Sequence, residues 1–108
     1  MQKIISELRF TAGSLLELIV LKMISGHAHS VEEIFNELRE IGFVTPKGSI
    51  YPLISRLRSK GYILSGREES ESGGAIKTYD LTEIGRARLA ELRKDWKRLN
   101  DVIAGLGR

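Results

Sequence analysis

Cysteine is absent from the sequence, which excludes disulfide bonds and thiolate metal sites and leaves the redox environment of the protein open. Long apolar runs are absent too. None approaches the roughly 20 residues of a membrane-spanning helix, and the N-terminus has no signal-peptide pattern. A chain of 108 residues is long enough for one domain with a modest core. We therefore expect a single cytoplasmic domain, residues 1–108, without contact to a membrane.

Patterns that indicate an enzyme or a metal centre are also missing. The sequence has no phosphate-binding loop, no paired carboxylates and no set of nucleophile, base and orienting group. Its two histidines, His27 and His29, stand beside a glycine without a third ligand at helical spacing, a pattern that rarely makes a zinc site. We expect no catalytic residue, no metal and no cofactor, and we interpret both histidines as exposed loop residues.

The first part of the chain predicts three helices. A short amphipathic helix is expected at residues 4–10, and a helix capped by its first serine should follow over residues 14–26. This second helix is apolar nearly all round, which indicates a central buried position. Ser30 and Glu33 have the spacing of a capping box, and an apolar stripe at i, i+3, i+4 and i+7 leads from there toward Gly42, which should end the third helix.

A fourth helix is expected between Thr45 and Gly61. Thr45 can cap it, Pro46 can occupy its first position, where a missing N–H costs nothing, and Gly61 suits its C-terminal end. Pro52 falls inside this range. Because proline removes one backbone hydrogen bond, we expect a kink at that point.

The fourth helix has two contrasting faces. One is an apolar stripe that predicts core packing, Ile50, Leu53, Ile54 and Leu57. The opposite face carries small and hydroxylated residues with cations on its flanks, and residues 45–61 contain four basic residues and no acid. Small residues permit close approach to a DNA groove and cations can meet phosphates, whereas a merely solvated face is the alternative. The candidate DNA contacts on this element are Lys47, Ser49, Tyr51, Ser55, Arg56 and Arg58.

The rest of the chain predicts a β-hairpin and a closing helix. Residues 62–65 and 76–81 are β-branched and aromatic segments separated by a long polar, glycine-rich loop. Thr82 can cap a last helix that reaches about Gly105. Apolar residues in this helix alternate spacings of three and four, as in a heptad seam. The seam residues that we expect at a dimer interface or beside a ligand are Leu89, Leu92, Trp96, Leu99 and Ile103.

Two helices with a short connection, followed at once by a hairpin, are the plan of a winged helix-turn-helix. The expected fold class is therefore mainly α with a small β-hairpin. We expect an N-terminal helix and a DNA-binding region in residues 1–81 and a dimerisation helix in residues 82–108.

Two sequence blocks together resemble the PadR family of transcriptional regulators. They are GSIYPLISRLRSKGYI, residues 48–63, and KTYDLTEIGRARL, residues 77–89. The matching positions are Ile50, Tyr51, Pro52, Arg56, Leu57 and Gly61, then Lys77, Tyr79, Leu81, Thr82 and Gly85. The resemblance extends from about Leu15 to the C-terminus. It implies a homodimeric winged-helix repressor that binds a pseudo-palindromic operator in double-stranded DNA, with residues around Tyr51 in the major groove and Lys77 at the backbone.

The chain departs from that family's pattern in two places. The segment between the first helices, which usually contains a Gly-Tyr pair, reads GHAHSVEE here, and the tip of the wing is acidic rather than basic. Glu68, Glu69 and Glu71 leave Arg67 and Lys77 as the only wing residues that we expect at phosphates.

Several alternatives stay open at this point. Trp96 is interpreted as an interface or core residue, but some multidrug-sensing members of the resembled family bind flat aromatic ligands at such a tryptophan. The fold could also serve as a protein-docking module, for which an apolar or acidic recognition helix would be expected, or as a non-specific architectural DNA-binding protein.

Overall fold

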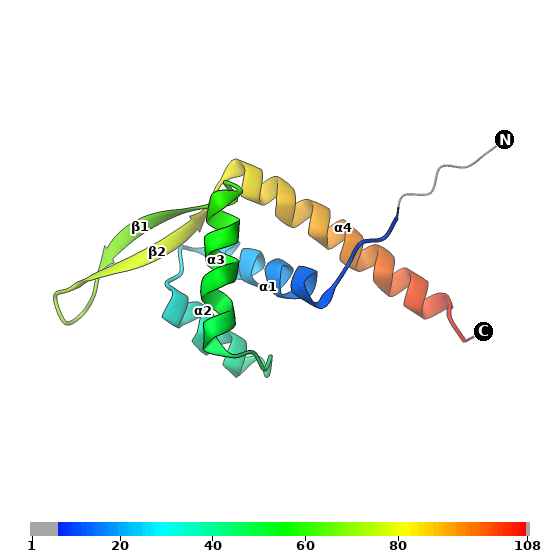
Figure 1. Ribbon diagram of the computed structural model, residues 1–108, viewed down its shortest axis with the longest axis horizontal. Helices are drawn as coiled ribbons and strands as arrows, with labels where there is room; N and C mark the ends of the chain where they lie inside the picture. Colours follow the sequence, from blue (N-terminus) through cyan, green and yellow to red (C-terminus); the bar gives the residue numbers. More distant parts are fainter. Residues whose placement is uncertain (1–6, 108) are drawn as a thin grey trace.

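The structure is a computed structural model that describes residues 7–107, and this part of the chain forms four α-helices, one 3₁₀ turn and a two-stranded hairpin (Figure 1). The elements are α1 (Ala12–Gly26), α2 (Val31–Glu40), η1 (Lys47–Ser49), α3 (Ile50–Ser59), β1 (Ile63–Glu69), β2 (Ala75–Leu81) and α4 (Glu83–Gly105). The helix expected at residues 4–10 falls partly outside the described residues, and its described part, residues 7–10, has no regular secondary structure.

The helix caps agree with the sequence pattern except at the starts of α1 and α3. At α1, Thr11, not Ser14, is the N-cap, because the Thr11 hydroxyl accepts a hydrogen bond from the backbone N–H of Ser14 at 3.1 Å. The capping box of Ser30 and Glu33 at the start of α2 is confirmed. Gly42 follows α2 with a φ of 80°, the left-handed conformation that suits glycine at a helix end.

The start of α3 differs from expectation. Thr45 makes no capping hydrogen bond. Instead the 3₁₀ turn η1 leads directly into the helix, which begins at Ile50. Pro52 is therefore in the first turn of α3, where a backbone N–H has no helical acceptor in any case. The prediction that Pro52 lies in the helix interior is wrong, and the reason to expect a kink there is removed with it. Gly61 ends the helix as expected, with a φ of 77°.

The hairpin is longer and its loop shorter than the sequence suggests. β1 and β2 pair antiparallel from Ile63 opposite Leu81 to Glu69 opposite Ala75, so that the connection comprises only residues 70–74. The polar segment 66–69, expected in the loop, is part of β1 because its backbone pairs with β2 regardless of side-chain polarity.

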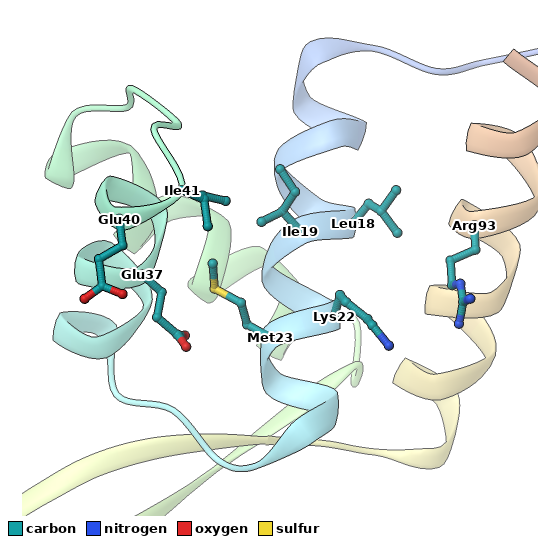
Figure 2. Close-up of a pocket in the computed structure, with 8 residues that line it drawn as sticks. All are labelled: Leu18, Ile19, Lys22, Met23, Glu37, Glu40, Ile41 and Arg93. Carbon is teal, nitrogen blue, oxygen red and sulfur yellow. The ribbon is translucent and has the colours of Figure 1, made fainter. Parts of the chain in front are cut away.

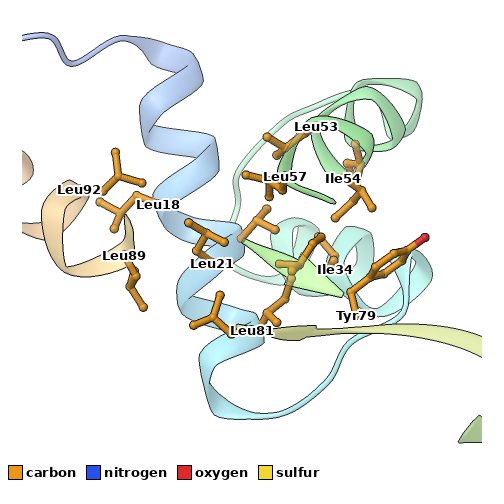
Figure 3. Close-up of a cluster of buried hydrophobic side chains, with 14 of the residues drawn as sticks. Leu18, Leu21, Ile34, Leu53, Ile54, Leu57, Tyr79, Leu81, Leu89 and Leu92 are labelled. Atoms are coloured by element: carbon orange, nitrogen blue, oxygen red, sulfur yellow. The ribbon is translucent and has the colours of Figure 1, made fainter. Parts of the chain in front are cut away.

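The core lies where α1, α2, α3, the base of the hairpin and the first turns of α4 meet (Figure 3). Its fully buried members include Leu21, Ile24, Ile34, Leu38, Ile50, Leu57, Ile63 and Leu92. The junction of hairpin and α4 is tight at Gly85, where a Cβ atom would stand 2.0 Å from the carbonyl oxygen of Tyr62. Thr82 caps α4, as expected, by accepting from the N–H of Gly85 at 3.0 Å.

The second half of α4 projects beyond the body of the molecule (Figure 1). The described chain measures 64 × 29 × 21 Å with a radius of gyration of 16.4 Å, whereas a compact chain of this length would have about 13 Å. No helix within residues 7–107 is both long enough and apolar enough to cross a membrane. The projecting helix is therefore an arm whose apolar residues have little cover within the described chain.

Candidate nucleic-acid interface

The outward face of α3 is the one expected from its sequence. Its apolar stripe is buried in the core, whereas Tyr51, Ser55 and Arg58 are exposed and Tyr51 keeps 55% of its surface. No acidic side chain belongs to η1 or α3, both of which lie wholly within the described residues. This face can therefore approach a polyanion without electrostatic repulsion from its own residues.

Lys47 is less available than the sequence suggests. Its ammonium forms an ion pair with Glu32 of α2 and lies 5.6 Å from the centre of the Phe35 ring. The hydrogen bond to Glu32 raises the pKa of Lys47, so that its charge is retained but is partly balanced. Ser49, by contrast, is exposed at the end of η1.

Arg56, whose side chain is half exposed, pairs with a buried acid that its sequence motif does not reveal. Its Nη2 lies 3.6 Å from Glu17 of α1, whose side chain is only 5% exposed, and Arg88 of α4 donates to the same carboxylate at 2.8 Å. Glu17 thus joins α1, α3 and α4. In the sequence, the only indication of this role is that Glu17 is an acid within a mainly apolar helix. Such an acid must be paired once it is buried.

The two cations of the wing face each other across the hairpin. Arg67 of β1 and Lys77 of β2 are direct cross-strand partners, both exposed. They lie on the face that contains Ile63 and Tyr79 at the base of the hairpin, since side chains alternate along a strand. Within residues 7–107, no ion pair is formed by the candidate cations Arg58, Arg67 and Lys77.

The seam of α4 is divided between two environments. Leu89 and Leu92 are 8% and 1% exposed and point toward α1 of the same chain, so they belong to the core of the monomer rather than to a free seam (Figure 3). Trp96 is 39% and Ile103 is 55% exposed, whereas Leu99 is partly buried. Leu106, the last residue with the seam spacing, is 69% exposed, and Val102, which the seam pattern does not include, is 48% exposed, so that the apolar surface extends to the end of the arm.

A groove of about 480 Å³ lies between α1, α2 and α4, and no sequence motif indicates it (Figure 2). Its apolar side chains are Leu18, Ile19, Met23 and Ile41. Lys22 and Arg93 line one side, and Glu37 and Glu40 of α2 line the opposite side. We call it the α1–α2–α4 groove.

The histidines do not both match the expectation of exposed loop residues. His27 is exposed, but His29 is 2% exposed and bonded through both ring nitrogens, so that interpretation is wrong for His29. Within residues 7–107, no group of three potential ligands could hold a metal ion.

Comparison with known proteins places this geometry in a family. The model of the transcriptional regulator PadR-like family matches residues 20–91. A transcriptional regulator from Streptococcus is 30% identical, with a TM-score of 0.82 over 88% of this chain and 94% of that chain. A PadR-like transcriptional regulator from Bacillus cereus is 29% identical, with a TM-score of 0.78 over 85% of this chain and 90% of that chain. The winged helix-turn-helix fold is thereby confirmed.

A more distant structure adds a bound partner. PadR from Bacillus subtilis, in complex with operator DNA, has a TM-score of 0.63 at 22% identity, over 71% of this chain and 46% of that chain. An uncharacterised protein from Lysinibacillus sphaericus is 25% identical over 91 residues, which cover 82% of this chain.

Proposed function

Because the chain belongs to the PadR-like family of transcriptional regulators, we propose that it is a cytoplasmic repressor that binds DNA sequence-specifically as a homodimer, and not an enzyme. The observation that carries this proposal is the acid-free outward face of α3, with the Arg67–Lys77 pair on the adjoining hairpin. These residues do not support a protein-docking surface, which would be apolar or acidic. They do not support a catalytic site either.

On this proposal α3 enters the major groove. Tyr51 and Ser55 near the middle of the exposed face contact base edges, and Ser49 lies where the helix begins. Arg58 on the flank contacts phosphate. Lys47 and Arg56 contribute less than the sequence suggests, because each already has a carboxylate partner within the chain.

On the wing, Arg67 and Lys77 together bind one stretch of DNA backbone. Like charges directly opposite each other on paired strands are unfavourable in the free protein. A phosphate between them removes that repulsion, so the pair is better suited to the bound state than to the free state. The acids at the tip, Glu68, Glu69 and Glu71, limit wing contacts to this pair.

The homodimer forms through the arm of α4. Exposed apolar residues from Trp96 to Leu106 need cover, and a second copy offers the same surface in a two-fold arrangement. If two arms pack antiparallel around Leu99, Gly105 of the partner subunit lies opposite Arg93, beside the α1–α2–α4 groove. The end of each arm then reaches the groove of the other copy.

Charge supports this placement of the arm. A helix C-terminus carries partial negative charge, and the last turn of α4 contains no basic residue that would balance it. Lys22 and Arg93 at one side of the groove can supply that balance from the partner. The apolar residues of the groove can receive Leu106 of the partner subunit.

Cysteine cross-linking tests the dimer, and the absence of native cysteine makes each introduced thiol unique. Leu99→Cys should form a disulfide-linked dimer, and Ile41→Cys combined with Leu106→Cys should do so as well. The matched control is Val44→Cys with Leu106→Cys, because Val44 is 97% exposed but does not line the groove. Cross-linking through Leu99→Cys alone would retain the dimer and reject the groove, and a monomer mass by light scattering would reject both.

DNA binding is tested by competition between a duplex from upstream of the protein's own gene and a random duplex. We expect operator affinity to exceed random affinity by about 10³-fold or more. Equal affinities with a steep salt dependence would instead indicate an architectural protein.

We further propose that a small flat aromatic ligand releases the repressor. The supporting observation is that Trp96 is 39% exposed beside Phe10, with ring centres 5.7 Å apart and planes inclined by 45°. Such a surface at the dimer interface can stack against a planar ligand.

A further inference from the structure

The backbone of His29, in the connection between α1 and α2, is hydrogen-bonded to β2 of the hairpin. Its N–H donates to the carbonyl of Tyr79 at 3.0 Å, and the N–H of Tyr79 donates to the carbonyl of His29 at 2.8 Å. This isolated bridge lies on the edge of β2 that does not face β1. The connection between α1 and α2 therefore holds β2 only two residues from Lys77, the expected phosphate contact of the wing.

The ring of His29 is fixed by two acceptors. Nδ1 lies 2.7 Å from the backbone carbonyl oxygen of His27, and Nε2 lies 2.6 Å from Oε2 of Glu37 on α2. A carbonyl oxygen can only accept, so Nδ1 must carry a hydrogen. The bond between Nε2 and Oε2 then requires a second hydrogen, either on the ring or on the carboxyl group. The pair thus holds one proton more than a neutral imidazole and a separate carboxylate.

We propose that His29 and Glu37 are positioning residues for DNA binding, and that the proton they share holds the β-hairpin in place against α1 and α2. This proposal rests on the proposed function, because it concerns how the wing is presented to DNA. When the proton leaves, the lone pair of Nε2 faces a carboxylate, and the bond becomes a repulsion at a ring that is 2% exposed. His29 must then shift, and its backbone bridge to Tyr79 weakens.

The charged surroundings of the pair are mixed. From the α1–α2 connection, the His27 ring stacks on His29 with centres 4.1 Å apart and planes inclined by 16°. From α2, the carboxylate of Glu33 is held mainly by the backbone of Ser30, and the charges of His29 and His27 also lower its pKa. From β2, Tyr79 contributes its two backbone hydrogen bonds to His29. Lys22 of α1 and Arg93 of α4 line the α1–α2–α4 groove across from Glu37.

The expected consequence is a wing that loosens as the pH rises. We call the His29–Glu37 hydrogen bond, together with the backbone bridge from His29 to Tyr79, the latch. The proton that His29 and Glu37 share stabilises the latch at low pH, and the latch is lost when this proton dissociates. One buried hydrogen bond corresponds to a factor of about 5 to 150 in a local opening equilibrium. The protection of the Tyr79 amide against hydrogen exchange, relative to its intrinsic rate, should fall by a factor in that range as the pH is raised from about 5 to about 8.

Glu37→Gln is the decisive variant, since the Glu37 side chain is 43% exposed and its replacement preserves shape. A glutamine amide can donate to the unprotonated Nε2, so the latch should persist without the shared proton. We expect Tyr79 protection and wing-dependent DNA affinity in Glu37→Gln to be independent of pH over this range. Glu37→Ala should lose protection at every pH. The matched control, Glu40→Gln on the same helix, should keep the wild-type pH profile, and so should His27→Gln.

The outcomes separate this proposal from the proposed function. If the wild-type protein fails to bind an operator while Tyr79 protection still falls with pH and is flat in Glu37→Gln, the latch stands and the DNA-binding role fails. If wild-type protection does not change with pH, or if Glu37→Gln retains the wild-type profile, the shared proton is rejected. A profile that is lost in His27→Gln but kept in Glu37→Gln would assign the titration to His27 and would also overturn the proposal.

Discussion

Arg67 and Lys77 are direct cross-strand partners on the exposed part of the hairpin, so two like charges stand opposite each other. We predict that Lys77→Gln leaves the free protein as stable as the wild type or slightly more stable, because it removes this repulsion. The same change should weaken binding to operator and random duplex alike and lower the salt dependence of log K by about one unit. Thermal melts and salt titrations measure the two effects. A selective loss on the operator would contradict the phosphate-binding role.

Arg56 and Arg58 are two positions apart on α3 and have different predicted roles. Arg56→Ala should reduce the free energy of unfolding by up to about 1 kcal/mol, because buried Glu17 loses one of its two partners. Arg58→Ala should change stability by less than about 0.5 kcal/mol but should weaken DNA binding. Urea melts and binding assays on both variants check this, and the reverse pattern would reassign the two arginines.

The difference between these arginines shows what sequence pattern can and cannot supply here. Periodicity and capping residues are local, so the positions of α2 and α4 and the buried stripe of α3 could be predicted. The partner of Arg56 could not, because Glu17 lies 39 positions earlier in the chain and meets it only after folding.

The prediction that all seam residues of α4 lie on a free surface is wrong for two of them, for the same reason. Heptad spacing identifies a face of the helix but not what covers it, and α1 of the same chain covers Leu89 and Leu92. The extent of the hairpin was underestimated because backbone pairing continues through polar residues such as Glu68 and Glu69.

Glu33 provides a pH-dependent contribution to stability. Its carboxylate accepts from the backbone N–H of Ser30 at 3.0 Å, and this bond lowers the pKa of Glu33. The contribution is therefore complete above the unfolded pKa of about 4.3 and is lost as the pH falls through the lower folded value. Relative to Glu33→Gln, the wild type should be more stable by about 0.3–1 kcal/mol at neutral pH, and thermal melts should converge on acidification. A difference that persists at low pH would contradict this.

Trp96 is the only tryptophan, so intrinsic tryptophan fluorescence reports on this position alone. If a flat aromatic ligand stacks there, planar dyes should quench the emission and release the protein from its operator. Trp96→Ala should lose the release by dye, measured at a protein concentration at which the variant is still a dimer, because Trp96 also belongs to the proposed dimer surface. Unchanged fluorescence across a panel of such dyes would leave Trp96 with a packing role only.

The most direct test of sequence reading by α3 is a comparison of Tyr51→Ala and Arg58→Ala in salt titrations on operator and random duplex. Loss of a base contact at Tyr51 should cost about 1–3 kcal/mol on the operator and little on random DNA, thereby reducing the ratio of the two affinities. Loss of a phosphate contact at Arg58 should weaken both complexes equally and lower the salt dependence by about one unit. If neither substitution changes operator affinity, the outward face of α3 does not read DNA and the proposed function is wrong.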